Sequence, residues 1–139
     1  MGHSLNPIYM RKIDRLMFAI SMHEGWIPTG APGHPTGSQA YLHHNPGNLR
    51  SSIFQSGSHN GFAVFKSDIQ GWMALEFDIM QKVRGKTVTG LNGESTNEQF
   101  INVWAPKADG NDTASYLNSV CATTGFDPSM KLKELLTDY

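Results

Sequence analysis

Apolar residues recur every three or four positions near the start of the chain, as they do on one face of an α-helix. Asn6 followed by Pro7 is typical of a helix start, and Gly25 is typical of a helix end, so the pattern predicts a helix from Pro7 to about His23. The next position on the same face is Glu24, which we therefore expect at the C-terminal end of the helix, in line with the core-facing residues. That face is formed by Tyr9, Ile13, Leu16, Met17 and Ile20.

Prolines and glycines interrupt residues 25–52 too often for regular structure, so the pattern predicts a long loop there. Long loops in compact domains commonly carry function. Farther along, the runs 49–54 and 61–66, joined by the turn-rich residues 56–60, predict a small β-hairpin.

Capping signals predict four more helices in the rest of the chain. These helices run from Ser67 to Gly85, from Ser95 or Thr96 to Pro106, from Asp112 to Gly125, and from Asp127-Pro128 to Leu136. The predicted apolar stripe of the first of them consists of Ile69, Trp72, Met73, Met80 and Val83. The predicted fold class is therefore α+β, mainly helical, with a small β-hairpin lobe, in a single domain over residues 1–139.

Composition excludes several classes of protein. The 11 Lys and Arg residues nearly balance the 12 Asp and Glu residues, so no charge excess favours nucleic acid or an anionic membrane. The single cysteine, Cys121, excludes an intramolecular disulfide and a Cys-rich zinc site. No apolar run is long enough for a membrane helix, and the first residues lack the pattern of a signal peptide. We expect a monomer that binds neither nucleic acid nor membranes.

Glu24 is the first candidate for chemistry. A carboxylate at the end of an apolar stripe, beside Trp26, is partly desolvated, which favours the protonated form that a general acid needs. The alternative is a side chain that turns into solvent at a frayed helix end. The pattern alone leaves both interpretations open.

The segment Asn45-Pro46-Gly47-Asn48-Leu49-Arg50 is the second candidate. Asparagine amides on a rigid Pro-Gly turn can hydrogen-bond sugar hydroxyl or acetamido groups. Asparagine in such loops also commonly bonds its own backbone and sets the shape of the turn, and this structural role is favoured for the segment taken alone.

Histidines and aromatic residues add fewer constraints. Five histidines fall in or near the predicted loops, but His43 and His44 are adjacent, which is poor geometry for chelation on a strand. We expect no metal and no other cofactor. Cys121 is predicted to be a buried, inert thiol. Tyr41 is a candidate for stacking on a sugar ring, whereas Trp104 is more typical of a core residue.

Two segments together resemble the catalytic core of lysozyme-like peptidoglycan glycosidases. They are the run Ala19-Ile20-Ser21-Met22-His23-Glu24-Gly25-Trp26 and the run Tyr41-Leu42-His43-His44-Asn45-Pro46-Gly47-Asn48-Leu49-Arg50. The downstream residues resemble a bacteriophage and prophage group of virion-associated lysozyme-like or lytic transglycosylase proteins, over about residues 10–126. They are Phe62, Phe65, Gly71-Trp72-Met73-Ala74-Leu75, Trp104-Ala105-Pro106, Asn111, Thr113, Tyr116 and Val120.

The resemblance implies a lysozyme-like fold and cleavage of the β-1,4 bond between N-acetylmuramic acid and N-acetylglucosamine in peptidoglycan glycan strands. Glu24 would be the catalytic acid. A lytic transglycosylase would use the same carboxylate as a base on the sugar's 6-hydroxyl, whereas a muramidase would use water and a second group. Such a protein would act in the periplasm or cell wall, or travel in a phage virion. The expected substrate-binding residues are Tyr41, His44, Asn45, Asn48, Phe65 and Tyr116.

The sequence offers no convincing second catalytic acid, which a hydrolase could use to activate water, and this favours the transglycosylase. Asp68 is typical of the first turn of a helix, and Asp109 and Asp112 are typical of a turn and a cap. Glu76 falls on the predicted inward stripe, where a buried structural hydrogen bond is the more common role. A muramidase and a non-catalytic virion or wall-binding protein remain the alternatives.

Overall fold

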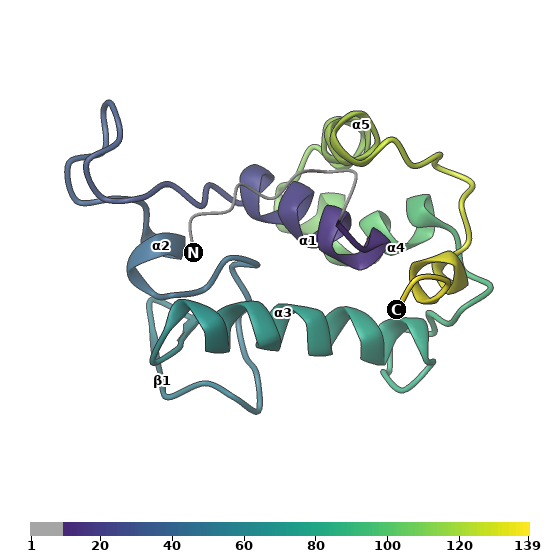
Figure 1. Cartoon of the computed structure of the whole chain (residues 1–139), viewed down its shortest axis with the longest axis horizontal. Helices are drawn as coiled ribbons and strands as arrows, with labels where there is room; N and C mark the ends of the chain where they lie inside the picture. Colours follow the sequence, from purple (N-terminus) through teal and green to yellow (C-terminus); the bar gives the residue numbers. More distant parts are fainter. Residues whose placement is uncertain (1–9) are drawn as a thin grey trace. The chain divides into compact units, whose positions relative to one another are not determined.

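Five α-helices and one two-stranded antiparallel sheet make up the regular structure of residues 10–139, which are the residues that the computed structural model describes (Figure 1). The elements in chain order are α1 (Lys12–His23), α2 (Gln39–Leu42), β1 (Gly57–His59), β2 (Phe62–Val64), α3 (Asp68–Val83), α4 (Asn97–Trp104), the 3₁₀ helix η2 (Lys107–Asp109), α5 (Thr113–Thr124) and the 3₁₀ helix η3 (Leu132–Leu136). The predicted α+β, mainly helical class is confirmed. Over the described residues, no helix has both the length and the apolar character to span a membrane.

Two parts of the chain each pack mainly within themselves. The first comprises the described residues up to Ala19 together with Met80–Tyr139, and the second comprises Ile20–Ile79. Buried apolar residues of the first unit include Phe100, Ile101, Tyr116, Val120, Leu132 and Leu135, and those of the second include Ile20, Ala63, Phe65, Leu75 and Ile79. Apart from Tyr116, every residue predicted for the site lies in the second unit.

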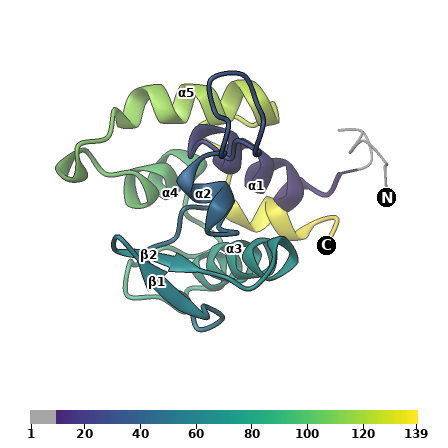
Figure 2. The same ribbon diagram turned by 90° about the vertical axis from the view of Figure 1, so that its left-hand side faces the viewer.

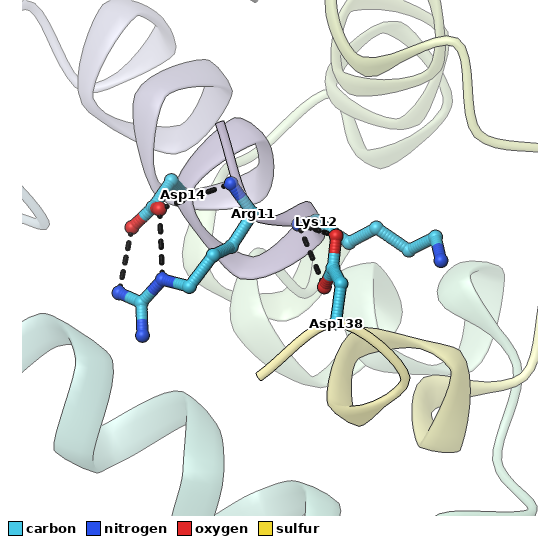
Figure 3. Close-up of polar contacts among 4 residues, drawn as sticks. All are labelled: Arg11, Lys12, Asp14 and Asp138. Carbon is cyan, nitrogen blue, oxygen red and sulfur yellow. Dashed lines mark hydrogen bonds and ion pairs between the residues drawn. The ribbon is translucent and has the colours of Figure 1, made fainter. Parts of the chain in front are cut away.

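Helix α1 begins later than predicted. Met10 and Arg11 are not helical, and Asn6 and Pro7 lie outside the described residues. The backbone N–H of Arg11 donates to the Asp14 carboxylate at 3.2 Å, and its guanidinium donates to the same group at 2.9 Å (Figure 3). The N–H of Lys12 donates to the Asp138 carboxylate. Because no helical carbonyl can reach these first amides, the two carboxylates define the start of the helix.

The end of α1 is defined by a Schellman motif. Gly25 has φ 79°, its N–H donates to the carbonyl of Met22 at 3.2 Å, and the N–H of Trp26 donates to the carbonyl of Ser21 at 2.9 Å. The left-handed conformation at the first residue after the cap is the one that glycine adopts most easily. Glu24 is therefore the C-cap residue. The predicted apolar face is confirmed over the described residues Ile13, Leu16, Met17 and Ile20, all of which are buried.

The predicted long loop is largely irregular but contains the short helix α2, which the sequence pattern did not predict. The Ser38 hydroxyl caps this helix by accepting the N–H of Tyr41 at 3.2 Å, and it also accepts the N–H of Ile27 at 3.1 Å. The N–H of Ser38 donates to the carbonyl of Ile27 at 2.9 Å. Residues 28–37 thus form a loop closed at its base, which is the dark-blue loop that rises away from α2 in Figure 1.

The β-hairpin is present, but its first strand was predicted wrongly. Strands β1 and β2 lie side by side in Figure 2, and in their register Gly57 pairs with Val64 and His59 pairs with Phe62. The connecting residues Asn60 and Gly61 both have positive φ, 53° and 81°. Asn-Gly favours a tight two-residue turn of type I′, so the strands must flank it directly. Residues 57–59, predicted as a turn, therefore form β1, and residues 49–54 are not a strand.

Helices α4 and α5 are confirmed, whereas the last predicted helix is wrong. Thr96 and Gln99 form a capping box on α4, and the Asp112 side chain caps α5. In place of a helix from Asp127-Pro128, only η3 forms. The reason is that the carbonyls of residues 128 and 130 accept the N–H groups of residues 98 and 97, the first amides of α4, and so are not available to a helix of their own.

The buried face of α3 differs from the predicted stripe. The Ser67 hydroxyl accepts the N–H of Gln70 at 3.3 Å, as its capping role predicted. Ile69 and Met73, however, are 72% and 57% exposed, and Glu76 is half-buried. The buried positions are Gly71, Ala74, Leu75, Ile79, Met80 and Val83. The helix thus turns small residues, not only large apolar ones, toward the interior.

Candidate active site

The Asn45–Asn48 turn is built around a buried asparagine. The Asn45 amide donates to the carbonyls of Leu49 and Ala63, both at 2.9 Å, and its oxygen accepts the N–H of Leu49 at 2.9 Å. The N–H of Asn48 donates to the carbonyl of Asn45 at 3.0 Å and closes the turn. Because Asn45 is fully buried and its amide is occupied within the protein, its role is structural. This corrects the prediction that it contacts substrate.

The turn lies directly against helix α3 at two glycines. A Cβ atom on Gly71 would stand 1.9 Å from the carbonyl oxygen of His44 and 2.9 Å from Cδ of Pro46. A Cβ atom on Gly47 would stand 2.7 Å from a methyl group of Leu75. Gly71 therefore allows the backbone of the turn to touch the helix, and the position of the turn depends on it.

Asn48 brings an amide group to Glu24. Its backbone is left-handed, with φ 50°, a conformation that asparagine tolerates better than most residues. From there its side-chain amide donates to Oε1 of Glu24 at 3.4 Å. Glu24 is half-buried at the C-cap of α1, and the Schellman motif gives this helix end a defined structure. The structure therefore favours a positioned carboxylate over the frayed-end alternative.

Three aromatic rings form a cluster in the same unit. Trp26 lies two residues after Glu24, and its ring meets the Tyr41 ring at a centroid distance of 5.1 Å and the Trp72 ring at 5.7 Å, both edge to face. All three residues are half-buried. We call Trp26, Tyr41 and Trp72 the aromatic cluster. Trp72 was predicted as a core residue of α3, so the sequence pattern missed it as a site candidate.

His44 is fixed on the first residue of α3. Its Nδ1 lies 2.7 Å from Oδ1 of Asp68, and its backbone has φ 53°. The two side chains are 42% and 46% exposed, so the imidazole remains accessible. Asp68 lies in the first turn of the helix, as predicted, and it also orients the histidine ring. Contact of His44 with substrate stays a prediction.

His43, which is buried, forms a second pair with the exposed His59. Its Nε2 lies 3.0 Å from Nδ1 of His59, while its own Nδ1 is buried and has no hydrogen-bond partner among the described residues. Burial, and secondarily the neighbouring His59, lower the pKa of His43 from its ordinary value of 6.5. The pair links the residue before His44 to strand β1, so it supports the turn rather than the chemistry.

We predict that this pair makes stability depend on pH. Below pH 6.5 the unfolded chain protonates His43 before the folded chain does, so the free energy of unfolding falls as the pH drops through 6.5 toward the lowered folded-state pKa. Urea unfolding at about pH 7.5 and about pH 5.5 measures this loss. His43→Phe should show a smaller loss than wild type, whereas His34→Gln, in the exposed loop, should match wild type. Equal losses in wild type and His43→Phe would contradict the prediction.

Two other predicted substrate contacts are core residues. Phe65 and Tyr116 are each only 1% exposed, so neither ring offers a surface on which a sugar could stack. Both predictions of direct contact are thereby corrected. Trp104 stacks on Phe100 at 5.5 Å, consistent with its expected packing role. Cys121 is half-buried rather than buried as predicted, and burial raises the pKa of its thiol, which suits an inert cysteine.

No metal site is evident among residues 10–139, because no three His, Cys, Asp or Glu side chains gather closely enough to hold an ion. Comparison with protein-family models, curated proteins and solved structures finds no match to the chain. Any functional conclusion therefore depends on the site itself.

Proposed function

We propose that the protein is a peptidoglycan lytic transglycosylase with a lysozyme-like fold, which cleaves the β-1,4 bond between N-acetylmuramic acid and N-acetylglucosamine. The observation that carries this proposal is the contact between Glu24 and Asn48. It joins a carboxylate at the end of a helix to the Asn-Pro-Gly-Asn turn, the two features on which the resemblance to lysozyme-like glycosidases depends. The mainly helical α+β architecture with a small hairpin is compatible with that fold.

In the proposed reaction, protonated Glu24 donates its proton to the glycosidic oxygen as the bond from C1 breaks. The leaving sugar departs with a 4-hydroxyl, and positive charge develops on the muramyl ring. The Glu24 carboxylate then removes the proton of the 6-hydroxyl on the same sugar, whose oxygen bonds to C1. The product is a 1,6-anhydro ring, Glu24 recovers its proton, and no water is consumed.

Asn48 would act as a positioning residue in this cycle. Its amide donates to one oxygen of the carboxylate, which orients the group and stabilises it after the first proton transfer.

Two other acidic side chains already bond to groups of the protein, which supports a transglycosylase over a muramidase that needs a second carboxylate. Asp68 is bonded to His44, and Asp112 caps α5.

Release of soluble fragments from purified sacculi tests the proposal. Wild type should release muropeptides with anhydro ends, and Glu24→Gln should not. Mass spectrometry distinguishes these ends from the reducing ends of a muramidase, which are heavier by one water. Equal release by both proteins would contradict the assignment of Glu24. Binding to sacculi without release by wild type would favour a non-catalytic wall-binding protein.

We predict that two substitutions of Asn48 separate its amide from its backbone. Asn48→Gly and Asn48→Ala both remove the amide, so both should lower the rate about tenfold, as expected for one hydrogen bond to a charged group. Glycine accepts a φ of 50° freely, whereas alanine is strained there, so Asn48→Ala alone should lose about 1 kcal/mol of stability. Sacculus digestion and urea unfolding measure the two effects. A full rate in Asn48→Gly would show that the amide does not matter.

A further inference from the structure

The aromatic cluster combines half-buried rings with polar hydrogens that the protein leaves without acceptors. Trp26 and Trp72 each carry an indole N–H, and Tyr41 carries a hydroxyl. Among residues 10–139 none of these three groups makes a hydrogen bond within the protein. The side-chain nitrogen and oxygen atoms that are both buried and without a partner comprise only His43 Nδ1 among the described residues. The three groups of the cluster are therefore not buried. All three groups can therefore meet a ligand.

Local contacts fix the backbone at each of the three residues, and the Trp26 ring contacts both other rings, so the cluster is preformed. Trp26 follows the glycine of the Schellman motif, and its backbone N–H donates to the carbonyl of Ser21 in the last turn of α1. The Tyr41 ring lies against Gly37, where a Cβ atom would stand 3.2 Å from it. Trp72 follows Gly71, which packs on the backbone of the turn. A preformed site loses little entropy when it binds.

We propose that the aromatic cluster binds neutral β-1,4-linked N-acetylhexosamine chains, with Trp72 as a main stacking surface. A pyranose ring presents C–H groups on its faces and oxygen atoms at its rim, which matches ring faces bordered by N–H and O–H donors. The three side chains carry no charge, which suits acetamido carbonyls as acceptors better than carboxylates or phosphates. This inference extends the proposed function, because the cluster includes Trp26, two residues from Glu24.

Calorimetric titration with chitohexaose tests the proposal in the Glu24→Gln protein, which does not consume the ligand. Trp72→Leu in this background should raise Kd about tenfold or more, because leucine offers no flat ring and no N–H donor. Trp72→Phe keeps a ring and should lose less. Trp104→Leu is the matched control, since Trp104 is packed on Phe100 in the other unit, and its Kd should stay within about twofold of the parent.

A second measurement, on the same Glu24→Gln protein, does not depend on how the Leu variants fold. Its three indole N–H groups give separate NMR signals, which single Trp→Phe variants can assign. Chitohexaose should shift the signals of Trp26 and Trp72 and leave that of Trp104 in place. No binding at millimolar chitohexaose, an unchanged Kd in Trp72→Leu, or a shift confined to Trp104 would overturn the proposal. Cellohexaose of equal affinity would overturn the acetamido assignment.

The two proposals can fail separately. If sacculi are cleaved in a Glu24-dependent way but chitohexaose does not bind through Trp72, the aromatic cluster is not the sugar site and the proposed reaction stands. If chitohexaose binds through Trp72 but Glu24→Gln digests sacculi like wild type, the cluster binds sugar and the proposed role of Glu24 fails.

Discussion

Gly71→Ala should destabilise the protein by at least about 3 kcal/mol, although alanine normally stabilises a helix relative to glycine by about 1 kcal/mol. The sign reverses because the new methyl group would stand 1.9 Å from the carbonyl oxygen of His44. That oxygen belongs to the backbone, so it cannot move aside as a flexible side chain would. Either the turn or the helix must shift by more than an ångström. Urea or thermal unfolding measures the loss.

Two other glycines provide graded controls. In Gly47→Ala the new methyl group meets a methyl of Leu75 at 2.7 Å, a side chain that can adjust, so the loss should be smaller. In Gly57→Ala it meets nothing within 4 Å, so stability should change by less than about 0.5 kcal/mol. Equal stability of the Gly71 and Gly57 variants would show that the turn does not rest on α3 as described.

The same substitution should also reduce the proposed activity of the protein that remains folded. A shift of the turn would move Asn48, whose side-chain amide contacts Glu24. A displacement of about 1 Å in a catalytic group can cost about a hundredfold in rate. Gly71 thus connects the packing of a helix to the geometry of the candidate site, and its effect on rate should exceed that of Gly47→Ala.

Local signals in the sequence predicted most helices correctly. Thr96 with Gln99, Asp112, Ser67 and Gly25 act through hydrogen bonds or φ values within a few residues, so their effects can be read without the rest of the fold. The Asn60-Gly61 pair is a local signal of the same kind and marks the hairpin turn, whereas the apolar run 49–54 suggests a strand that does not form. The last predicted helix does not form for a different reason, because carbonyls of that segment accept hydrogen bonds from the first N–H groups of α4.

Predictions that depend on distant contacts were less successful. The apolar period of α3 placed Trp72 and Met73 inward, but the turn packs on Gly71, so the interior begins at a residue without a side chain. Asn45 and Asn48 occur in one motif and have different roles. The amide of Asn45 donates to the carbonyl of Ala63 in strand β2, whereas the amide of Asn48 donates to Glu24. Spacing predicted that the motif matters, but only the fold distinguishes its two amides.

Glu24→Gln should lower the rate of muropeptide release about 10³-fold, within the range expected when a general acid is removed. Glutamine has nearly the same shape, and its amide oxygen can still accept the Asn48 hydrogen bond, but it has no proton to donate to a glycosidic oxygen. Stability should therefore stay within about 0.5 kcal/mol of wild type. Timed digestion of sacculi and urea unfolding, performed on the same preparation, separate loss of chemistry from loss of structure.

Two companion variants show whether the position of the carboxylate matters as well as its presence. Glu24→Asp keeps the acid but retracts it by about one carbon–carbon bond, roughly 1.5 Å, so the rate should fall about a hundredfold. Glu134→Gln makes the same chemical change as Glu24→Gln at an exposed position in η3 and should leave the rate unchanged. If Glu24→Asp were as active as wild type, Glu24 could not be the proton donor at a bond held in fixed geometry. If Glu134→Gln lost as much activity as Glu24→Gln, both losses would result from the change in net charge, acting on binding to the cell wall. The ordering Glu134→Gln, Glu24→Asp, Glu24→Gln, from most to least active, is what a positioned general acid requires.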